Sequence, residues 1–170
     1  MLLEQVLKAN RTSRNWRTTA IDQVIRNLIS KEDRVLDFGA GKNAIQALRL
    51  QEEGYQVTAY DFGNNCIPGV HDPKALSHRY DIVYASNVIN VQSSLEMLEE
   101  TLNQVLSVLK PSAKFVANYP KEPRMLGFSE ERMLKKLKKH FQSIERYPGT
   151  KNIIWVMKNT WAFTQIRTGA

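Results

Sequence analysis

The sequence predicts an α/β protein built around a mostly parallel sheet. Apolar runs with strand character alternate with helical patterns along most of the chain, at 34–38, 56–61, 81–86 and 114–118. Such alternation is typical of strand–helix–strand units, whose neighbouring strands run parallel. Two more runs, at 142–147 and 152–158, flank a turn at Pro148–Gly149 and predict an antiparallel hairpin at the end of the sheet.

The helices follow from apolar periodicity and from the residues that begin and end them. Residues 3–12 and 17–30 are expected to be helical. The pattern Ser93-x-x-Glu96 is a capping box, which predicts the start of a long helix, and Pro111 is expected to end that helix. Ser129 is expected to cap a further helix.

Length and composition indicate a single domain spanning residues 1–170, since 42% hydrophobic content supplies a sizeable core. Residues 62–79 are rich in turn residues, so either a short third strand or a degenerate helix is expected there. No apolar run approaches the ~20 residues of a membrane span. The one cysteine, Cys66, excludes an internal disulfide and a cysteine-based zinc site. We expect a cytoplasmic protein without a metal or a membrane partner.

The most informative motif follows the first strand. Asp37 ends the apolar run, and Gly39 and Gly41 come two and four positions later. Glycines at such a turn let the backbone approach a ligand closely, and the helix expected from Ala44 onwards points its first N–H groups at that ligand. Asp61 ends the next strand, at a spacing that suits a hydrogen bond to the ribose hydroxyls of an adenosine.

Three nucleotide sites compete for this motif. A phosphate-binding P-loop fails, because Asn43 follows Gly41-Lys42 and the required earlier glycine is missing. A dinucleotide site matches the stretch Gly39–Ala44, but Asp37 would repel a pyrophosphate and the chain is short for a separate substrate domain. An adenosine ligand with a cationic amino end suits Asp37 better, and that describes S-adenosylmethionine (SAM).

Together, Asp37-x-Gly39-x-Gly41, Asp61 after the second strand and the run from Tyr80 to Asn90 resemble the class I SAM-dependent methyltransferases. The resemblance extends from about Ile21 to Trp155. It implies a Rossmann-like three-layer sandwich with a seven-stranded or slightly reduced sheet. The stretch Asn87–Gln92 is also similar to that of small phage and bacterial methyltransferases. Where the family usually has a third glycine this chain has Asn43, which tolerates unusual backbone angles.

The resemblance and the strand ends together give a set of candidate site residues. The cofactor contacts are expected from the first two loops and from the loop after strand 81–86, at Asp37, Gly39, Ala40, Gly41, Asp61, Phe62, Asp72 and Asn87. Asn87 and Asn90 are the candidate catalytic residues, because they follow a strand at its carboxyl end. The three histidines, His71, His78 and His140, lack metal-ligand or triad spacing and are expected at the surface.

A basic N-terminal segment is the candidate for substrate binding. Residues 1–30 are expected to form a helical lid, in which Arg11, Arg14 and Arg17 supply charge and Trp16 a stacking face. The net charge of +7 agrees with a polyanionic acceptor such as DNA or RNA, although charge alone also serves solubility. The signatures of the common DNA-base methyltransferases are absent. A non-catalytic SAM-binding or partner-binding regulatory module and, more weakly, a dinucleotide-binding enzyme remain as alternatives.

Overall fold

The computed structural model describes residues 4, 5, 7, 19–123 and 127–159. The order of elements is α2 (Ala20–Leu28), β1 (Arg34–Phe38), α3 (Ile45–Glu52), β2 (Gln56–Tyr60), η1 (Gly63–Asn65), η2 (Ala75–Ser77), β3 (Tyr80–Ala85), α4 (Leu95–Val108), β4 (Leu109–Tyr119), α5 (Glu130–Leu137), β5 (Ser143–Arg146) and β6 (Ile153–Lys158). The strands form one sheet in the order β2-β1-β3-β4-β6-β5. None of the helices described is long and apolar enough to cross a membrane.

The sheet combines four parallel strands with an antiparallel end. The strands β2, β1, β3 and β4 are parallel neighbours, while β6 runs antiparallel to both β4 and β5. The expected hairpin at the end of the sheet is therefore confirmed. Six strands make up the sheet among the described residues, which agrees with the slightly reduced form of the expected fold.

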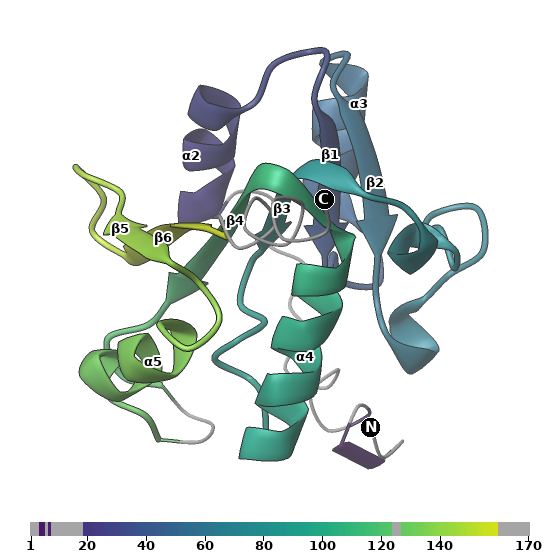
Figure 1. Cartoon of the computed structure of the whole chain (residues 1–170). Coiled ribbons are helices and arrows are strands. Elements are labelled where there is room, and N and C mark those ends of the chain that lie inside the picture. The colour runs from purple at the N-terminus through teal and green to yellow at the C-terminus, as the bar shows by residue number, and fades with distance from the viewer. Residues whose placement is uncertain (1–3, 6, 8–18, 124–126, 160–170) are drawn as a thin grey trace, which may run out of the picture.

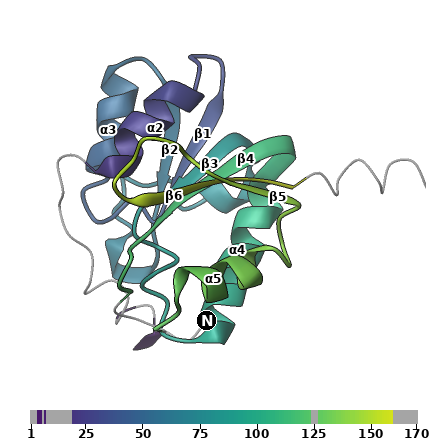
Figure 2. The ribbon, with the colours of Figure 1, turned by 90° about the vertical axis from the view of Figure 1, so that its left-hand side faces the viewer.

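Helices cover both faces of the sheet, so the fold has three layers (Figures 1 and 2). Strand residues alternate between the two faces. Leu36 and Phe38 of β1 pack with α4 and α5, while Val35 packs with α2 and α3. Asp37 lies between Leu36 and Phe38 in the strand and is paired in register with Tyr84, so both face the α2–α3 side. This alternation buries a carboxyl group in an apolar layer.

The segment 62–79 replaces a further strand at the β2 edge. It contains the short helices η1 and η2 and an isolated bridge between Pro68 and His71. One backbone hydrogen bond, from the Asp72 N–H to the Ala59 carbonyl at 2.9 Å, attaches it to β2. The degenerate helix expected here is thus present in two short pieces, and β2 forms the edge of the described sheet.

Two sequence predictions around α4 are wrong in detail. The N-cap is Ser94, whose hydroxyl accepts from the Met97 N–H at 3.1 Å, whereas the Ser93 hydroxyl contacts the Met97 sulfur instead. The helix ends at Val108 before Pro111 is reached, and Pro111 lies within β4. The proline is tolerated because the pairing of β3 with β4 is irregular there. Ser129 caps α5 as predicted, by accepting from the Arg132 N–H.

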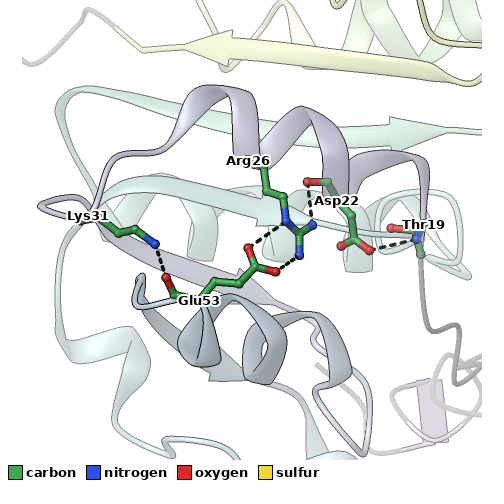
Figure 3. A network of polar contacts seen from close by, with 5 residues as sticks. All are labelled: Thr19, Asp22, Arg26, Lys31 and Glu53. Carbon is green, nitrogen blue, oxygen red and sulfur yellow. Dashed lines mark hydrogen bonds and ion pairs between the residues drawn. The ribbon is translucent and has the colours of Figure 1, made fainter.

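The helix α2 is part of the core. Its residues Ile21, Val24 and Ile25 are buried against the sheet, and a polar network joins the helix to α3. Arg26 donates to both carboxylate oxygens of Glu53 at 2.6 and 3.0 Å, as Figure 3 shows. The Lys31 ammonium donates to the Glu53 carbonyl, which belongs to the last turn of α3. A lid role for the residues before Thr19 stays a prediction.

We expect Ile25→Ala to lower the free energy of unfolding by about 2–5 kcal/mol, because it empties a fully buried site in the core. Glu53→Ala should have a much smaller effect, since it removes a solvent-exposed ion pair. Urea denaturation of the two variants tests this. Equal effects would contradict the placement of α2 in the core.

Candidate cofactor site

The carboxyl ends of β1, β2 and β3 meet at one edge, because these strands are parallel neighbours. Ligands of open α/β sheets bind at this edge. The loops that leave the strands there are 39–44 after β1, 61–72 after β2 and 86–92 after β3. They carry all of the predicted cofactor residues except Asp37, which is in β1 itself. The residues predicted from the sequence therefore lie at the edge where the topology places a ligand site.

The turn after β1 has the backbone geometry that glycine favours. Gly39 has φ 77° and Gly41 has φ 75°. The N–H groups of Gly39 and Ala40 both donate to the Tyr60 carbonyl at 2.9 Å, which fixes the turn to the end of β2. A Cβ atom at Gly39 would lie 2.5 Å from Val88 Cγ2. The loop after β3 thus packs directly on the glycine turn.

The strained residue in this loop is Ala44, one position later than expected. Asn43 does not have a positive φ, whereas Ala44 has φ 45° and is the N-cap of α3. Alanine has no side-chain acceptor, so the N-cap residue itself makes no capping hydrogen bond. The Asp37 carboxyl contacts the Ala47 N–H in the first turn of α3. The start of this helix therefore lies beside the glycine turn, a position that suits a polar ligand group.

Asp37 is almost fully buried and its Oδ2 has no hydrogen-bond partner among the described residues. Burial raises the pKa of this carboxyl to about 8, and the nearby Asp61 carboxylate adds to the rise. The Tyr84 hydroxyl and the Ala47 N–H oppose the shift. The two side chains are close enough to affect one another, although the Tyr84 hydroxyl also lacks a hydrogen bond of standard geometry. Without a ligand, Asp37 is largely protonated at neutral pH.

Asp61 lies at the end of β2 and holds the glycine turn. Its Oδ2 accepts from the Gly41 N–H at 2.5 Å and its Oδ1 accepts from the Phe62 N–H at 2.7 Å. Burial raises its pKa, while these two hydrogen bonds, His71 and Asn65 lower it in part. A carboxylate has about four acceptor sites, so two backbone contacts leave capacity for a ligand hydroxyl.

The two remaining candidates near β2 have structural partners. Phe62 forms edge-on ring contacts with Phe38 and Tyr60, at centroid distances of 5.2 Å each. It therefore contributes to the core, while staying partly exposed. The Asp72 carboxylate accepts from the Lys74 N–H at 2.8 Å, as in an Asx turn. Its contact with an adenine amino group stays a prediction.

The loop after β3 begins with a reciprocal pair of amides. Asn118, at the end of β4, accepts from the Asn87 N–H at 2.6 Å and donates to the Asn87 side-chain oxygen at 2.8 Å. This contact holds Asn87 in the left-handed region, at φ 57°. Gln92 anchors the far end of the loop by donating to the Val88 carbonyl. Asn87 is thus presented at the carboxyl edge by a fixed loop.

Unpartnered polar atoms gather at this edge. Among the described residues, buried side-chain oxygens without a hydrogen-bond partner are Asp37 Oδ2, Tyr84 Oη, Ser86 Oγ, Asn90 Oδ1 and Gln104 Oε1. All but the last belong to the ends of β1 and β3 or to the following loop. Buried polar atoms are normally paired, since an unpaired one costs about 1–3 kcal/mol. A polar ligand would supply the missing partners.

Sequence reasoning missed three residues of this edge. Tyr84 and Asn118 could have been found, because both stand at or near the carboxyl ends of strands and carry polar groups. The expectation for His71 was wrong, since this side chain is only 4% exposed and contacts Gly41. Its partners come from the fold of the loop 61–72, which the sequence does not reveal. Arg11, Arg14, Trp16 and Arg17 lie outside the described residues, and their substrate role stays a prediction.

Comparison with known proteins agrees with this geometry. A family model described as a methyltransferase domain matches residues 12–161. The chain belongs to this methyltransferase family. The resemblance to class I SAM-dependent methyltransferases is therefore confirmed, while the similarity to a small phage type stays a prediction. No curated protein matches the methyltransferase significantly by sequence.

Solved structures show the same fold. The methyltransferase is similar to a TehB-like SAM-dependent methyltransferase from Corynebacterium glutamicum, with a TM-score of 0.63 and 14% identity over 89% of this chain and 91% of that chain. A glycopeptide N-methyltransferase, MtfA, in complex with SAM gives 0.60 and 12% over 82% and 93%. Magnesium protoporphyrin IX methyltransferase from Synechocystis PCC 6803 with bound SAM gives 0.56 and 18% over 82% and 76%. The Rossmann-like expectation is confirmed.

We expect Gly39→Ala to lower the free energy of unfolding by about 1–3 kcal/mol, because alanine is strained at a positive φ. Its Cβ would also clash with Val88. Val88→Ala in the same chain should recover part of the loss, measured against Val88→Ala alone in a double-mutant cycle by urea denaturation. An additive pair would show that the two loops do not contact each other as described.

We expect Asp37→Asn to stabilise the ligand-free methyltransferase increasingly as the pH rises. The folded state keeps a proton on Asp37 up to about pH 8, whereas the unfolded chain releases it near its usual pKa of 3.8. Stability of the wild type therefore falls between these pH values, by up to about 1.4 kcal/mol per pH unit from this group. Asparagine does not ionise, so the stability of the variant does not fall with pH through this position.

Urea denaturation at several pH values between 5 and 8 measures this difference. Asp81→Asn is the matched control, because the pKa of Asp81 is shifted in the opposite direction to that of Asp37. Some burial opposes the shift, but hydrogen bonds from the Arg34 N–H and Lys110 hold the pKa of Asp81 below its usual value. That variant should be less stable than wild type across the same range. A pH-independent effect of Asp37→Asn would refute the buried, protonated state.

Proposed function

We propose that this chain is a SAM-dependent methyltransferase whose cofactor binds at the carboxyl ends of β1, β2 and β3. In this proposal Asp37 faces the methionine ammonium, Gly39, Ala40 and Gly41 pass beneath the cofactor, and Asp61 binds the ribose hydroxyls. The single observation that carries the proposal is the row of unpartnered buried oxygens at this edge, beside a glycine turn, in a chain of the methyltransferase family.

The chemistry of Asp37 suits a cationic partner. Its carboxyl is buried and protonated without one, since burial raises its pKa to about 8. An ammonium group beside it would favour the ionised form and supply the missing contact for Oδ2. Binding would then release a proton near neutral pH. This supports a ligand with an amino end over a pyrophosphate, which the carboxylate would repel.

When bound, SAM would supply a sulfonium-bound methyl group: an acceptor nucleophile would bond to the methyl carbon in line as the carbon–sulfur bond breaks and S-adenosylhomocysteine leaves. The chain's contribution is to bind, orient and exclude water. Asn87 is placed for this by Asn118, and Asn90 carries an unpartnered buried oxygen in the same loop. We assign both residues to orienting the acceptor and the transferred methyl group. An asparagine side chain hydrogen-bonds without taking up a proton.

The class of methyl acceptor is a separate question from the binding of SAM. Two of the similar structures are named as methyltransferases of a glycopeptide and of magnesium protoporphyrin IX, which are not nucleic acids. The net charge of +7 and the predicted basic N-terminal segment support a polyanion instead. Tritiated-methyl transfer from SAM to separate DNA, RNA and metabolite fractions distinguishes these acceptors. SAM binding without transfer to any fraction would favour the non-catalytic module.

We expect Asp61→Ala to weaken SAM binding by about 1.5–3 kcal/mol, as for loss of hydrogen bonds to a charged group. Isothermal titration calorimetry measures the affinity. Asp33→Ala is the matched control, because Asp33 lies at the amino end of β1, away from the site. Urea denaturation of both variants shows whether the fold persists, since Asp61 also binds Gly41 and Phe62. NADH binding more tightly than SAM would overturn the choice of cofactor.

A further inference from the structure

His71 is a buried imidazole that the proposed function does not use. It lies in the segment 62–79 that covers the β2 edge, where the chain turns sharply between Ile67 and His71. The His71 N–H donates to the Ile67 carbonyl at 2.9 Å, and Gly69 within this turn has φ 82°. The turn directs the imidazole toward the glycine loop after β1, far from it in sequence.

Both ring nitrogens of His71 have defined partners. Nδ1 lies 3.0 Å from the Ile67 N–H, which can only donate, so Nδ1 must accept. Nε2 lies 2.8 Å from the Gly41 carbonyl, which can only accept, so Nε2 must carry the proton. The two contacts together require the neutral Nε2–H tautomer. The imidazole therefore links two backbone segments through one fixed arrangement.

Both backbone polar groups of Gly41 are bound by residues of the loop 61–72. The Asp61 carboxylate accepts from its N–H at 2.5 Å, and His71 donates to its carbonyl at 2.8 Å. The Gly41 carbonyl also accepts from the Ala44 N–H at 3.1 Å, and a glycine at φ 75° has no side chain to restrict it further. A loop that is already held in one conformation loses less conformational entropy when a ligand binds.

We propose that His71 is a positioning residue, which holds Gly41 in the conformation that receives the cofactor. The proposal rests on the proposed function in that SAM is taken as the ligand of this loop. His71 does not touch the reacting atoms. It acts by donating to the Gly41 carbonyl, and its contact with Ile67 fixes the tautomer that can donate. The segment that replaces a strand at the β2 edge thereby controls the cofactor loop.

Two substitutions separate the two contacts. His71→Gln places an amide N–H near the position of Nε2 and retains a donor for Gly41. His71→Asn places an amide oxygen near the position of Nδ1 and retains only the acceptor for Ile67. We expect calorimetric SAM affinity within about threefold of wild type for His71→Gln and about tenfold weaker for His71→Asn, the effect of losing one hydrogen bond. His78→Asn, at an exposed histidine of the same segment, should bind like wild type.

A second measurement needs no cofactor. Long-range proton–nitrogen NMR spectra of the wild type at pH 7 should show His71 as the neutral Nε2–H tautomer. The Gly41 carbonyl carbon should shift in His71→Asn and stay near its wild-type position in His71→Gln. An Nδ1–H tautomer or a charged ring would overturn the inference, and so would SAM affinity in His71→Asn equal to that in His71→Gln.

The two proposals fail in distinguishable ways. If the folded wild type does not bind SAM, the proposed function fails. The part of the inference that concerns the His71–Gly41 contact is then decided by the tautomer and by the Gly41 carbonyl shift. If the wild type binds SAM but the variants unfold in thermal melts, the tautomer of His71 in the wild type decides whether the inference holds.

Discussion

Three consecutive backbone N–H groups, of Gly39, Ala40 and Gly41, are bound to the end of β2, and the candidate site depends on this attachment. Two of them donate to the Tyr60 carbonyl and the third to Asp61. The turn can follow this path because glycine tolerates its positive φ angles. It thereby brings the start of α3, the β3 loop and the acid of β2 around one edge of the sheet.

Asp37 connects this site to the stability of the fold. Strand alternation places its carboxyl on the α2–α3 face, where Ile25 and Ala47 are fully buried. An ionisable group in such a place is destabilising unless a partner satisfies it. Tyr84, its neighbour in β3, also carries an unpartnered oxygen, and such a pair suits a site that receives a polar ligand. The ligand would then stabilise the folded state by binding it preferentially.

The β2 edge of the sheet is covered by a segment of short helices and turns. Residues 62–79 take the place of a further strand, with one backbone hydrogen bond to β2 at Asp72. Side chains make a second connection, to the loop after β1. Asp61 and His71 both bind Gly41, so the loop after β1 is joined to the segment that covers the edge.

The sequence alone determined the α/β class, the order of strands and helices, and the acids and glycines of the first two loops. These are local signals: apolar periodicity, a glycine pair after a strand, and an acid at the end of the next strand. Tertiary structure decided what local signals do not contain. The pairing of Asn87 with Asn118 joins residues 31 positions apart, and the contact of His71 with Gly41 joins residues 30 apart. Packing against neighbouring elements likewise overrides the preference of a single residue at three other places. They are the positive φ at Ala44 instead of Asn43, the Ser94 cap of α4, and the strand that contains Pro111.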